Sequence, residues 1–269
     1  MVLKVALLGY GAIGREVRRM LLADGGSISM TGVIARGPLA GGEPGEARDG
    51  LPGLGLEEAL ERADLVIECA SATAVREHGP RIIASGTDLL IASIGALANP
   101  PLRRALTAGP GRAHLSTGAI GGLDLLRAAA LDGGLERVTL STTKAPAALI
   151  NPGMDPATRS RIEAAAGPTE IFAGTVAEAV LRFPRNINVA AALALAVGDF
   201  AMVRVRILAD PVAALTLHRI EAEGSAGKYA FDVANAPDPL NPATSALTAR
   251  SIVAGVHRLS GRRGSFHFI

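Results

Sequence analysis

The sequence predicts an α/β protein with a doubly wound parallel sheet, followed by a second, α+β domain with a mixed or antiparallel sheet. Strand and helix patterns alternate through residues 1–116, which is typical of a parallel sheet with helices on both faces. From residue 136 onward, several strand patterns follow one another without helices between them, which favours antiparallel pairing. The length of 269 residues is typical of two domains. We place them at residues 1–116 and 117–244, and we expect the C-terminal segment 245–269 to pack back on the first domain.

The first domain opens with an apolar strand pattern over residues 3–8, and Val17, Met20 and Leu21 then recur at helical spacing. The later strands are short and almost continuously apolar, as expected for a sheet buried on both faces. The pair Gly79–Pro80 is expected to weaken or break the helix that contains it. The further elements are a strand over 28–35, a Gly- and Pro-rich loop over 36–55, a helix over 56–63, a strand over 64–68, a helix over 73–84, a strand over 88–92, a helix over 100–108 and a strand over 113–116.

The second domain is dominated by strand patterns. In one of them, Val203, Val205 and Ile207 alternate with two arginines, which indicates a strand with one buried and one exposed face. The strands are expected over 136–143, 169–173, 202–209, 215–223 and 228–234, and helices are expected from 123 and over 175–181, 188–197 and 245–259.

Composition excludes several classes of protein. Aromatic residues make up only 3% and tryptophan is absent, so the core must consist of Ala, Val, Leu and Ile. No stretch approaches the roughly 18 unbroken apolar residues of a membrane helix, and the net charge of +2 with no long basic run makes nucleic acid an unexpected partner. The single cysteine, Cys69, excludes an internal disulfide and a cysteine-based zinc site, and we predict no metal. Because the chain enters a strand directly, we expect a cytoplasmic protein.

The turn from Gly9 to Gly14 matches the dinucleotide-binding fingerprint GxGxxG in its required place, between a strand and a helix. Gly9 permits the sharp turn, Gly11 lets the backbone approach a pyrophosphate, and Gly14 lets the helix pack on the strand. Ala12 and Ile13 begin the helix, whose N–H groups and dipole attract phosphate. The first domain is therefore expected to be a Rossmann domain that binds a dinucleotide.

The sequence leaves the choice between NAD and NADP open. An acidic residue at the end of the second strand normally binds the ribose 2′-hydroxyl of NAD. Here that strand ends in Arg36, whose guanidinium suits a 2′-phosphate instead, although it also suits an ordinary loop. We therefore predict that both NAD and NADP serve as cofactors.

Several segments follow the ends of the predicted parallel strands, where such sheets bind ligands. Ser71 follows the third strand, and Ser93–Gly95 follow the fourth. A second glycine-rich turn follows the fifth, and in it Gly118 and Ala119 are placed to line the nicotinamide and Ile120 the substrate. The same turn also suits a flexible hinge between the domains.

Seven segments beyond the glycine fingerprint carry a further resemblance: Ser93–Leu97, Ser116–Asp124, Thr142–Pro146, Phe183–Ala190, Ala209–Pro211, Leu217–Ile220 and Asn241–Ser245. They resemble the L-aspartate dehydrogenase family, in the family's order and over nearly the whole chain. The glycine fingerprint alone is shared by many dehydrogenases, whereas the fourth and sixth of these segments are much more specific. Thr216, where the family often has Asn, and Cys69, at a small-residue position, are modest departures.

The resemblance implies oxidative deamination of L-aspartate to oxaloacetate and ammonia through iminoaspartate, or the reverse amination, with NAD or NADP. It also implies a homodimer and a role in supplying iminoaspartate to NAD biosynthesis.

Four residues of the second domain carry the expected chemistry. From spacing alone, His218 suits a structural role, whereas the resemblance implies that it is the catalytic acid and base. The ordinary pKa of a histidine side chain lies near neutrality, which suits proton exchange. Asn186 and Asn188 each suit a helix cap, and their amides also suit the nicotinamide carboxamide or a substrate carboxylate. The resemblance implies that Asn188 contacts the cofactor, and we predict that Asn186 binds the substrate. Lys144 is the best candidate to bind a substrate carboxylate, against the alternative of a solvated surface lysine.

Other enzyme families share the predicted order of domains. A homoserine dehydrogenase or a dihydrodipicolinate reductase has a similar domain order, although the basic substrate motifs of the latter are not evident. A dinucleotide-sensing protein without catalysis is a different class, against which His218 argues, since a sensor needs no acid–base group. Cys69 suggests a thiol nucleophile, but its place at the end of an apolar strand favours a small buried side chain.

Overall fold

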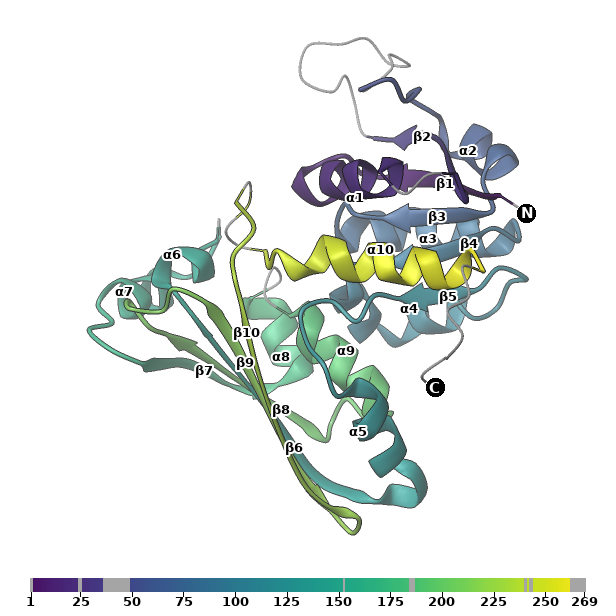
Figure 1. Cartoon of the computed structure of the whole chain (residues 1–269). Helices are drawn as coiled ribbons and strands as arrows, with labels where there is room; N and C mark the ends of the chain where they lie inside the picture. The colour runs from purple at the N-terminus through teal and green to yellow at the C-terminus, as the bar shows by residue number, and fades with distance from the viewer. Residues whose placement is uncertain are drawn as a thin grey trace. The chain divides into compact units, whose positions relative to one another are not determined.

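The protein is described from a computed structural model, which covers residues 2–23, 26–35, 49–151, 153–183, 187–239, 241 and 244–261. It divides into two compact units. Unit 1 comprises Met1–Ser116 with Thr248–Ile269, and unit 2 comprises Thr117–Leu247. Figure 1 shows the two units, each built around its own sheet.

Unit 1 contains a parallel five-stranded sheet in the order β2-β1-β3-β4-β5. The order reverses direction between β1 and β3, which is the switch point of a doubly wound sheet. The predicted α/β class with a Rossmann sheet is thereby confirmed. The strands are β1 (Leu3–Leu8), β2 (Ile28–Ile34), β3 (Leu65–Glu68), β4 (Asp88–Ile91) and β5 (Ala113–Leu115), and the helices are α1 (Ala12–Leu22), α2 (Leu56–Arg62), α3 (Ala72–Ala84), the 3₁₀ helix η1 (Ile94–Ala98), α4 (Pro100–Ala105) and α10 (Leu247–Leu259).

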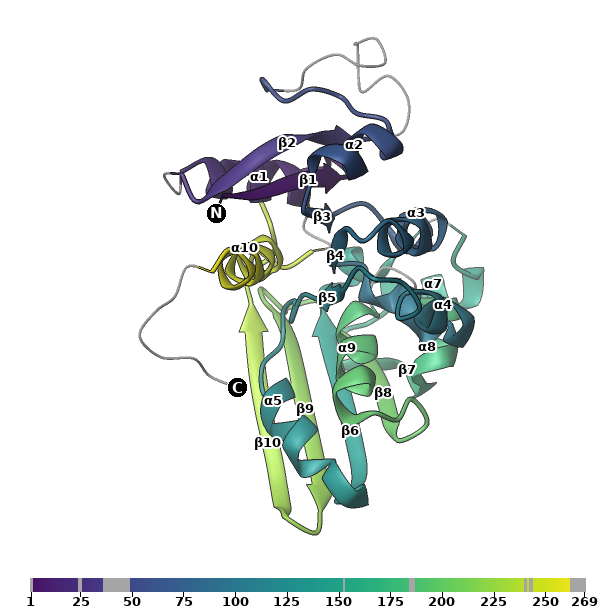
Figure 2. The same cartoon turned by 90° about the vertical axis from the view of Figure 1, so that its right-hand side faces the viewer.

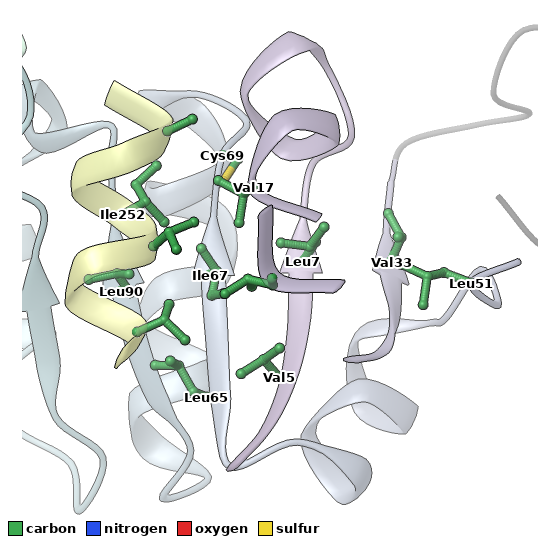
Figure 3. Close-up of a cluster of buried hydrophobic side chains, with 14 residues drawn as sticks. Val5, Leu7, Val17, Val33, Leu51, Leu65, Ile67, Cys69, Leu90 and Ile252 are labelled. Atoms are coloured by element: carbon green, nitrogen blue, oxygen red, sulfur yellow. The ribbon is translucent and has the colours of Figure 1, made fainter. Parts of the chain in front are cut away.

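The core of unit 1 joins the first strand of the chain to its last described helix. Ala249, Ile252, Val253 and Val256 of α10 are buried in one cluster with β1, β3 and β4 residues such as Leu7. Figure 3 draws Ile252 in this cluster, beside Leu90 and Ile67. Burying such an aliphatic side chain contributes about 1.5–3 kcal/mol, so this helix contributes substantially to the stability of unit 1.

The expected break at Gly79–Pro80 is wrong, because α3 continues through Pro80 to Ala84. A Cβ on Gly79 would lie 2.9 Å from the side chain of Leu106, so the glycine lets the helix pack closely against its neighbours. Ile82 and Ile83, which follow the proline, are fully buried. The burial of this last turn offsets the hydrogen bond that Pro80 cannot donate.

Unit 2 contains a mixed five-stranded sheet in the order β10-β9-β6-β8-β7. Strands β6 and β8 run parallel and the other pairs are antiparallel, which confirms the predicted mixed sheet. Figure 2 shows α5 and α9 side by side on one face of this sheet. The strands are β6 (Leu135–Lys144), β7 (Thr169–Thr175), β8 (Val203–Ala209), β9 (Thr216–Gly224) and β10 (Gly227–Asn235), and the helices are α5 (Leu123–Ala129), the 3₁₀ helix η2 (Leu131–Gly133), α6 (Pro146–Leu149), α7 (Pro156–Glu163), α8 (Val176–Arg182) and α9 (Asn188–Val197).

Two of these helices, α6 and α7, were not predicted from the sequence. The signal for α7 is present, because Asp155 caps the helix by accepting a hydrogen bond from the Thr158 N–H at 2.9 Å, and Pro156 occupies its first turn. The helix buries only Ile162, so it lacks the apolar periodicity by which longer helices are recognised.

Candidate active site

The glycine turn of unit 1 has the geometry of a phosphate-binding loop. Gly9 has a φ of +95°, and a Cβ there would lie 2.6 Å from the Cβ of Ala70. A Cβ on Gly14 would lie 2.5 Å from the Gly9 carbonyl oxygen, whereas a Cβ on Gly11 would meet nothing within 4 Å. The first and last glycines are thus required for packing, and the middle one leaves the backbone open.

Helix α1 begins beside this opening. Its N-cap is Gly11, which has no side chain to occupy the first N–H groups, and Ala12 and Ile13 form its first turn. Open backbone and N–H groups at a helix start are what a pyrophosphate requires. The residues present therefore fit a dinucleotide.

Tyr10 links the glycine turn to Asp49. Its hydroxyl donates a hydrogen bond to Asp49 Oδ2 at 2.6 Å. Desolvation, followed by this hydrogen bond, raises the pKa of Tyr10 to about 12, so its hydroxyl keeps its proton at neutral pH. The predicted 2′-phosphate ligand Arg36 lies outside the described residues.

The carboxyl ends of β3 and β4 are joined by a buried carboxylate. Glu68 accepts hydrogen bonds from the N–H and the hydroxyl of Ser93, each at 2.8 Å. Ser71 lies in the same loop region, where its hydroxyl accepts a hydrogen bond from the Ala74 N–H at 3.2 Å and caps α3. Burial, and then the charge of Glu68, raises the pKa of the Cys69 thiol well above its usual range. A protonated, buried thiol fits a packing role for Cys69 rather than that of a nucleophile.

In unit 2, the second glycine-rich turn lies between β5 and α5. Gly118 has a φ of +65°, and Ala119 and Ile120 are buried. The buried side chain of Asn235, the last residue of β10, donates a hydrogen bond from Nδ2 to the Ala119 carbonyl oxygen at 2.8 Å. This bond fixes the turn to the end of the sheet.

His218 lies on the buried face of β9, together with Ile220. Its Nδ1 atom lies 2.9 Å from the hydroxyl of Thr142, which is directly opposite on β6. Desolvation, and then the charge of Lys144, lowers the pKa of His218 to about 3. The imidazole is therefore neutral at physiological pH, and it is 4% exposed.

Lys144 is the last residue of β6 and lies two positions after Thr142, on the same face of the strand. It is 7% exposed, so the alternative of a solvated surface lysine is wrong. Burial lowers the pKa of Lys144 to about 8, which leaves the ammonium form predominant at neutral pH. The structure thus gathers a neutral imidazole, a hydroxyl and a buried cation at one end of the sheet.

Asn188 is the first residue of α9 and is exposed. The N-cap of α9 is Ile187, so the capping role considered for Asn188 is wrong. Asn186 lies outside the described residues.

Three polar residues of these sites were not singled out from the sequence: Glu68, Thr142 and Asn235. Each is buried and each lies at or near the end of a strand. Glu68 could have been recognised from the sequence, because it is a charged residue at the end of the apolar run Leu65–Ile67. The other two become recognisable only through partners 76 and 116 positions away in the sequence.

The described residues hold neither a candidate metal cluster nor a candidate membrane span. No three His, Cys, Asp or Glu side chains of this part of the chain are grouped to hold a metal ion. Within the same ranges, no helix has the length and apolarity needed to cross a membrane.

Two protein families match the chain. The family described as aspartate dehydrogenase, C-terminal, matches residues 124–259, and that described as homoserine dehydrogenase, NAD binding domain, matches residues 9–112. The L-aspartate dehydrogenase of Ruegeria pomeroyi is 36% identical over 263 residues, which cover 95% of this chain and 92% of that protein. L-aspartate dehydrogenase 2 of Bordetella pertussis is 38% identical over 268 residues, which cover 95% of this chain and 96% of that protein.

Solved structures show the same fold. The crystal structure of aspartate dehydrogenase from Thermotoga maritima matches with a TM-score of 0.74 and 28% identity, and the match covers 100% of both chains. A hyperthermophilic archaeal homoserine dehydrogenase in complex with NADPH matches with a TM-score of 0.61 over 99% of this chain and 100% of that one. At 10% identity, the second match shows likeness of fold alone.

Proposed function

The chain belongs to the L-aspartate dehydrogenase family, and we propose that His218, Lys144 and the turn at Gly118–Ile120 perform its chemistry. It is an NAD(P)-dependent oxidoreductase that oxidises L-aspartate. The products that follow from this chemistry are oxaloacetate and ammonia, formed by hydrolysis of iminoaspartate. The same groups serve the reverse amination.

Unit 1 supplies the binding site for NAD or NADP. When bound, the nicotinamide ring of the cofactor serves as the hydride acceptor of the oxidation. Gly9, Gly11 and Gly14 shape the turn that would hold the pyrophosphate, and Ala12 and Ile13 supply the helix start. Five further residues are assigned to the cofactor by the same proposal: Arg36, Ser71, Gly118, Ala119 and Asn188.

His218 is the proposed general acid and base. Removal of a hydride from the α-carbon of aspartate must be accompanied by loss of a proton from its amine, so a neutral base is required. The low pKa of His218 ensures that it is neutral. When Nδ1–H donates to the Thr142 hydroxyl, the lone pair is left on Nε2, and this atom is free to take up the amine proton and return it during imine hydrolysis.

Lys144 is proposed to bind a substrate carboxylate. A cation in a buried site attracts a carboxylate more strongly than one in water, because the local dielectric constant is lower. Ile120 is proposed to contact the apolar part of the substrate, and Asn186 to donate to its second carboxylate. The hydrogen bond from Asn235 supports this assignment by holding the turn that contains Ile120 in one place.

The observation that carries the proposal is the buried, neutral His218 bonded to Thr142, with Lys144 nearby on the same face. The test uses pure protein with NAD or NADP and a panel of L-aspartate, L-homoserine and L-glutamate, with nicotinamide reduction followed at 340 nm. We expect turnover with L-aspartate only, and a His218→Ala variant that folds and binds NADH but loses turnover by about 10²–10⁴-fold. If the His218→Ala variant turns over aspartate as fast as the native protein does, the proposed role of His218 is refuted. If the native protein binds the nucleotide but turns over none of the substrates, a dinucleotide-sensing protein is supported instead.

We also propose that the enzyme is a cytoplasmic homodimer that supplies iminoaspartate to NAD biosynthesis. A single buried cysteine suits a reducing compartment. The face of the unit 2 sheet opposite to His218 exposes Arg206, Arg219 and Glu221, a polar surface on which a second copy can pack. Light scattering after size exclusion tests the dimer, and growth of a strain that lacks its iminoaspartate source tests the metabolic role.

A further inference from the structure

Glu68 is a buried acidic residue that the chemistry described so far does not use. It ends β3, and its side chain has no exposed surface. Oε1 accepts hydrogen bonds from the Ala70 N–H and the Ser93 hydroxyl, both at 2.8 Å. Oε2 accepts hydrogen bonds from the Ser93 N–H at 2.8 Å and from the Ala92 N–H at 3.2 Å. One carboxylate therefore joins the loop after β3 to the loop after β4.

The surroundings of Glu68 match its ionised form. Burial raises the pKa of Glu68 above its usual value, and the backbone and hydroxyl donors of Ser93, Ala70 and Ser71 oppose this rise. Three of the four partners are backbone N–H groups, which can only donate, so these contacts favour a carboxylate with lone pairs on both oxygens. A charge in this position is costly to bury, and an apolar side chain of similar size could fill the volume at lower cost.

The topology places this charge along the path of the cofactor within unit 1. In a doubly wound sheet, the dinucleotide crosses the carboxyl edge at the switch point, with its pyrophosphate at the first turn and its adenosine toward β2. The other half then crosses the ends of β3 and β4, which are the two strands that Glu68 joins. Ala70 also packs against Gly9, so the Glu68 network is continuous with the pyrophosphate turn.

We propose that Glu68 is a positioning residue which holds both loops beneath the nicotinamide half of the cofactor and whose negative charge favours the oxidised form. The oxidised nicotinamide ring carries a positive charge and the reduced ring does not, so a nearby fixed anion stabilises the first more than the second. Water is excluded around Glu68, which preserves the interaction. The proposal rests on the cofactor binding stated above.

The test compares Glu68→Gln with the native full-length protein. Kd for NADH is measured by its fluorescence, and Kd for NAD⁺ by displacement of NADH, both at pH 8. We expect the ratio of Kd for NAD⁺ to Kd for NADH to rise by about tenfold, as loss of a charge interaction of ordinary strength implies. A Ser93→Ala control removes one donor and keeps the charge, so its ratio stays within about twofold of native.

The outcomes separate the possible roles. The proposal is overturned if the ratio of the two Kd values is unchanged in Glu68→Gln, whether or not both affinities are weakened equally. That result would show that Glu68 only holds the loops and does not affect the preference for the oxidised cofactor. If native protein binds neither nucleotide, the cofactor assignment itself is wrong. If thermal unfolding shows that Glu68→Gln does not fold, Glu68→Asp is measured instead. Its charge is retained, so the proposal predicts an unchanged ratio, and a tenfold change in that variant would overturn the proposal.

Discussion

The hydroxyl of Thr142 lies 2.9 Å from Nδ1 of His218, and the two residues are direct partners across the antiparallel pair of β6 and β9. Both side chains are buried, so water does not compete for this bond. The pairing register thus places a hydroxyl where it orients the imidazole and leaves Nε2 for the substrate. The proposed catalytic histidine is positioned by sheet geometry rather than by a mobile loop.

Replacement of Thr142 should affect turnover through His218. Thr142→Val has nearly the same shape but lacks the hydroxyl, so kcat should fall about tenfold, corresponding to one neutral hydrogen bond. Thr142→Ser restores the hydroxyl and should recover most of the activity. Steady-state kcat and KM for L-aspartate provide the measurement, and a valine variant with native kcat would show that the bond does not orient the histidine.

Acid should destabilise the protein partly through His218. Its pKa is about 3 in the folded state and near 6.5 when unfolded, so between these values only the unfolded chain binds the proton. Stability is therefore complete above pH 6.5 and falls as the pH drops below it, by about 2 kcal/mol at pH 5. Urea unfolding at pH 7 and pH 5 measures this loss. A His218→Gln variant should lose about 2 kcal/mol less than native protein over the same interval, and equal losses would contradict the predicted shift.

Binding of aspartate should depend on the charge of Lys144. The pKa of about 8 means that the ammonium is lost as the pH rises through 8, whereas an arginine in its place stays charged. The ratio of native kcat/KM to that of Lys144→Arg should therefore fall above pH 8, because only the native residue loses its charge there. Ionisation of the substrate amine affects both proteins equally and cancels in this ratio. Lys144→Met should raise KM for aspartate at every pH. A ratio that is flat from pH 7 to 10 would exclude Lys144 as the carboxylate ligand.

The three fingerprint glycines should respond differently to alanine. Gly9→Ala places a Cβ against Ala70 at a φ of +95°, and Gly14→Ala places one against a backbone oxygen, so each should destabilise the fold by about 1–3 kcal/mol. Gly11→Ala meets no neighbour and should keep native stability while weakening NADH binding. Thermal unfolding and NADH titration of the three variants test this. Equal affinity in Gly11→Ala and native protein would count against a pyrophosphate at this turn.

The hydrogen bond from Asn235 to Ala119 should matter for both stability and substrate binding. Asn235→Leu preserves the approximate volume but leaves the Ala119 carbonyl without this donor, at a cost of about 1–3 kcal/mol. Because the turn also contains Ile120, kcat/KM for aspartate should fall as well. Asp232→Asn, an exposed change on the same strand, is the control and should alter neither quantity. Native kinetics in a destabilised Asn235→Leu variant would separate the turn from the substrate site.

Local sequence was sufficient for most elements of the fold. The apolar runs that became β1, β3 and β4 are buried on both faces of a parallel sheet, and such runs need no distant information to be recognised. The alternation in β8 likewise revealed its buried and exposed faces. The continuation of α3 past Pro80 was missed, because it depends on packing that the proline signal does not contain.

Sequence patterns were enough to predict the fold class and the dinucleotide turn and to select Lys144 as the candidate carboxylate ligand, and the family resemblance assigned His218 to catalysis. The dinucleotide turn is recognised from neighbouring residues alone, because its strand, its turn and the start of its helix follow one another between Leu3 and Gly14. The folded protein was needed to show that His218 faces Thr142, that Lys144 is buried, and that Glu68 and Asn235 each hold a loop at the end of a sheet. The reason is physical: desolvation and hydrogen bonding depend on neighbours brought together by strand pairing, and strand register is a property of the folded sheet.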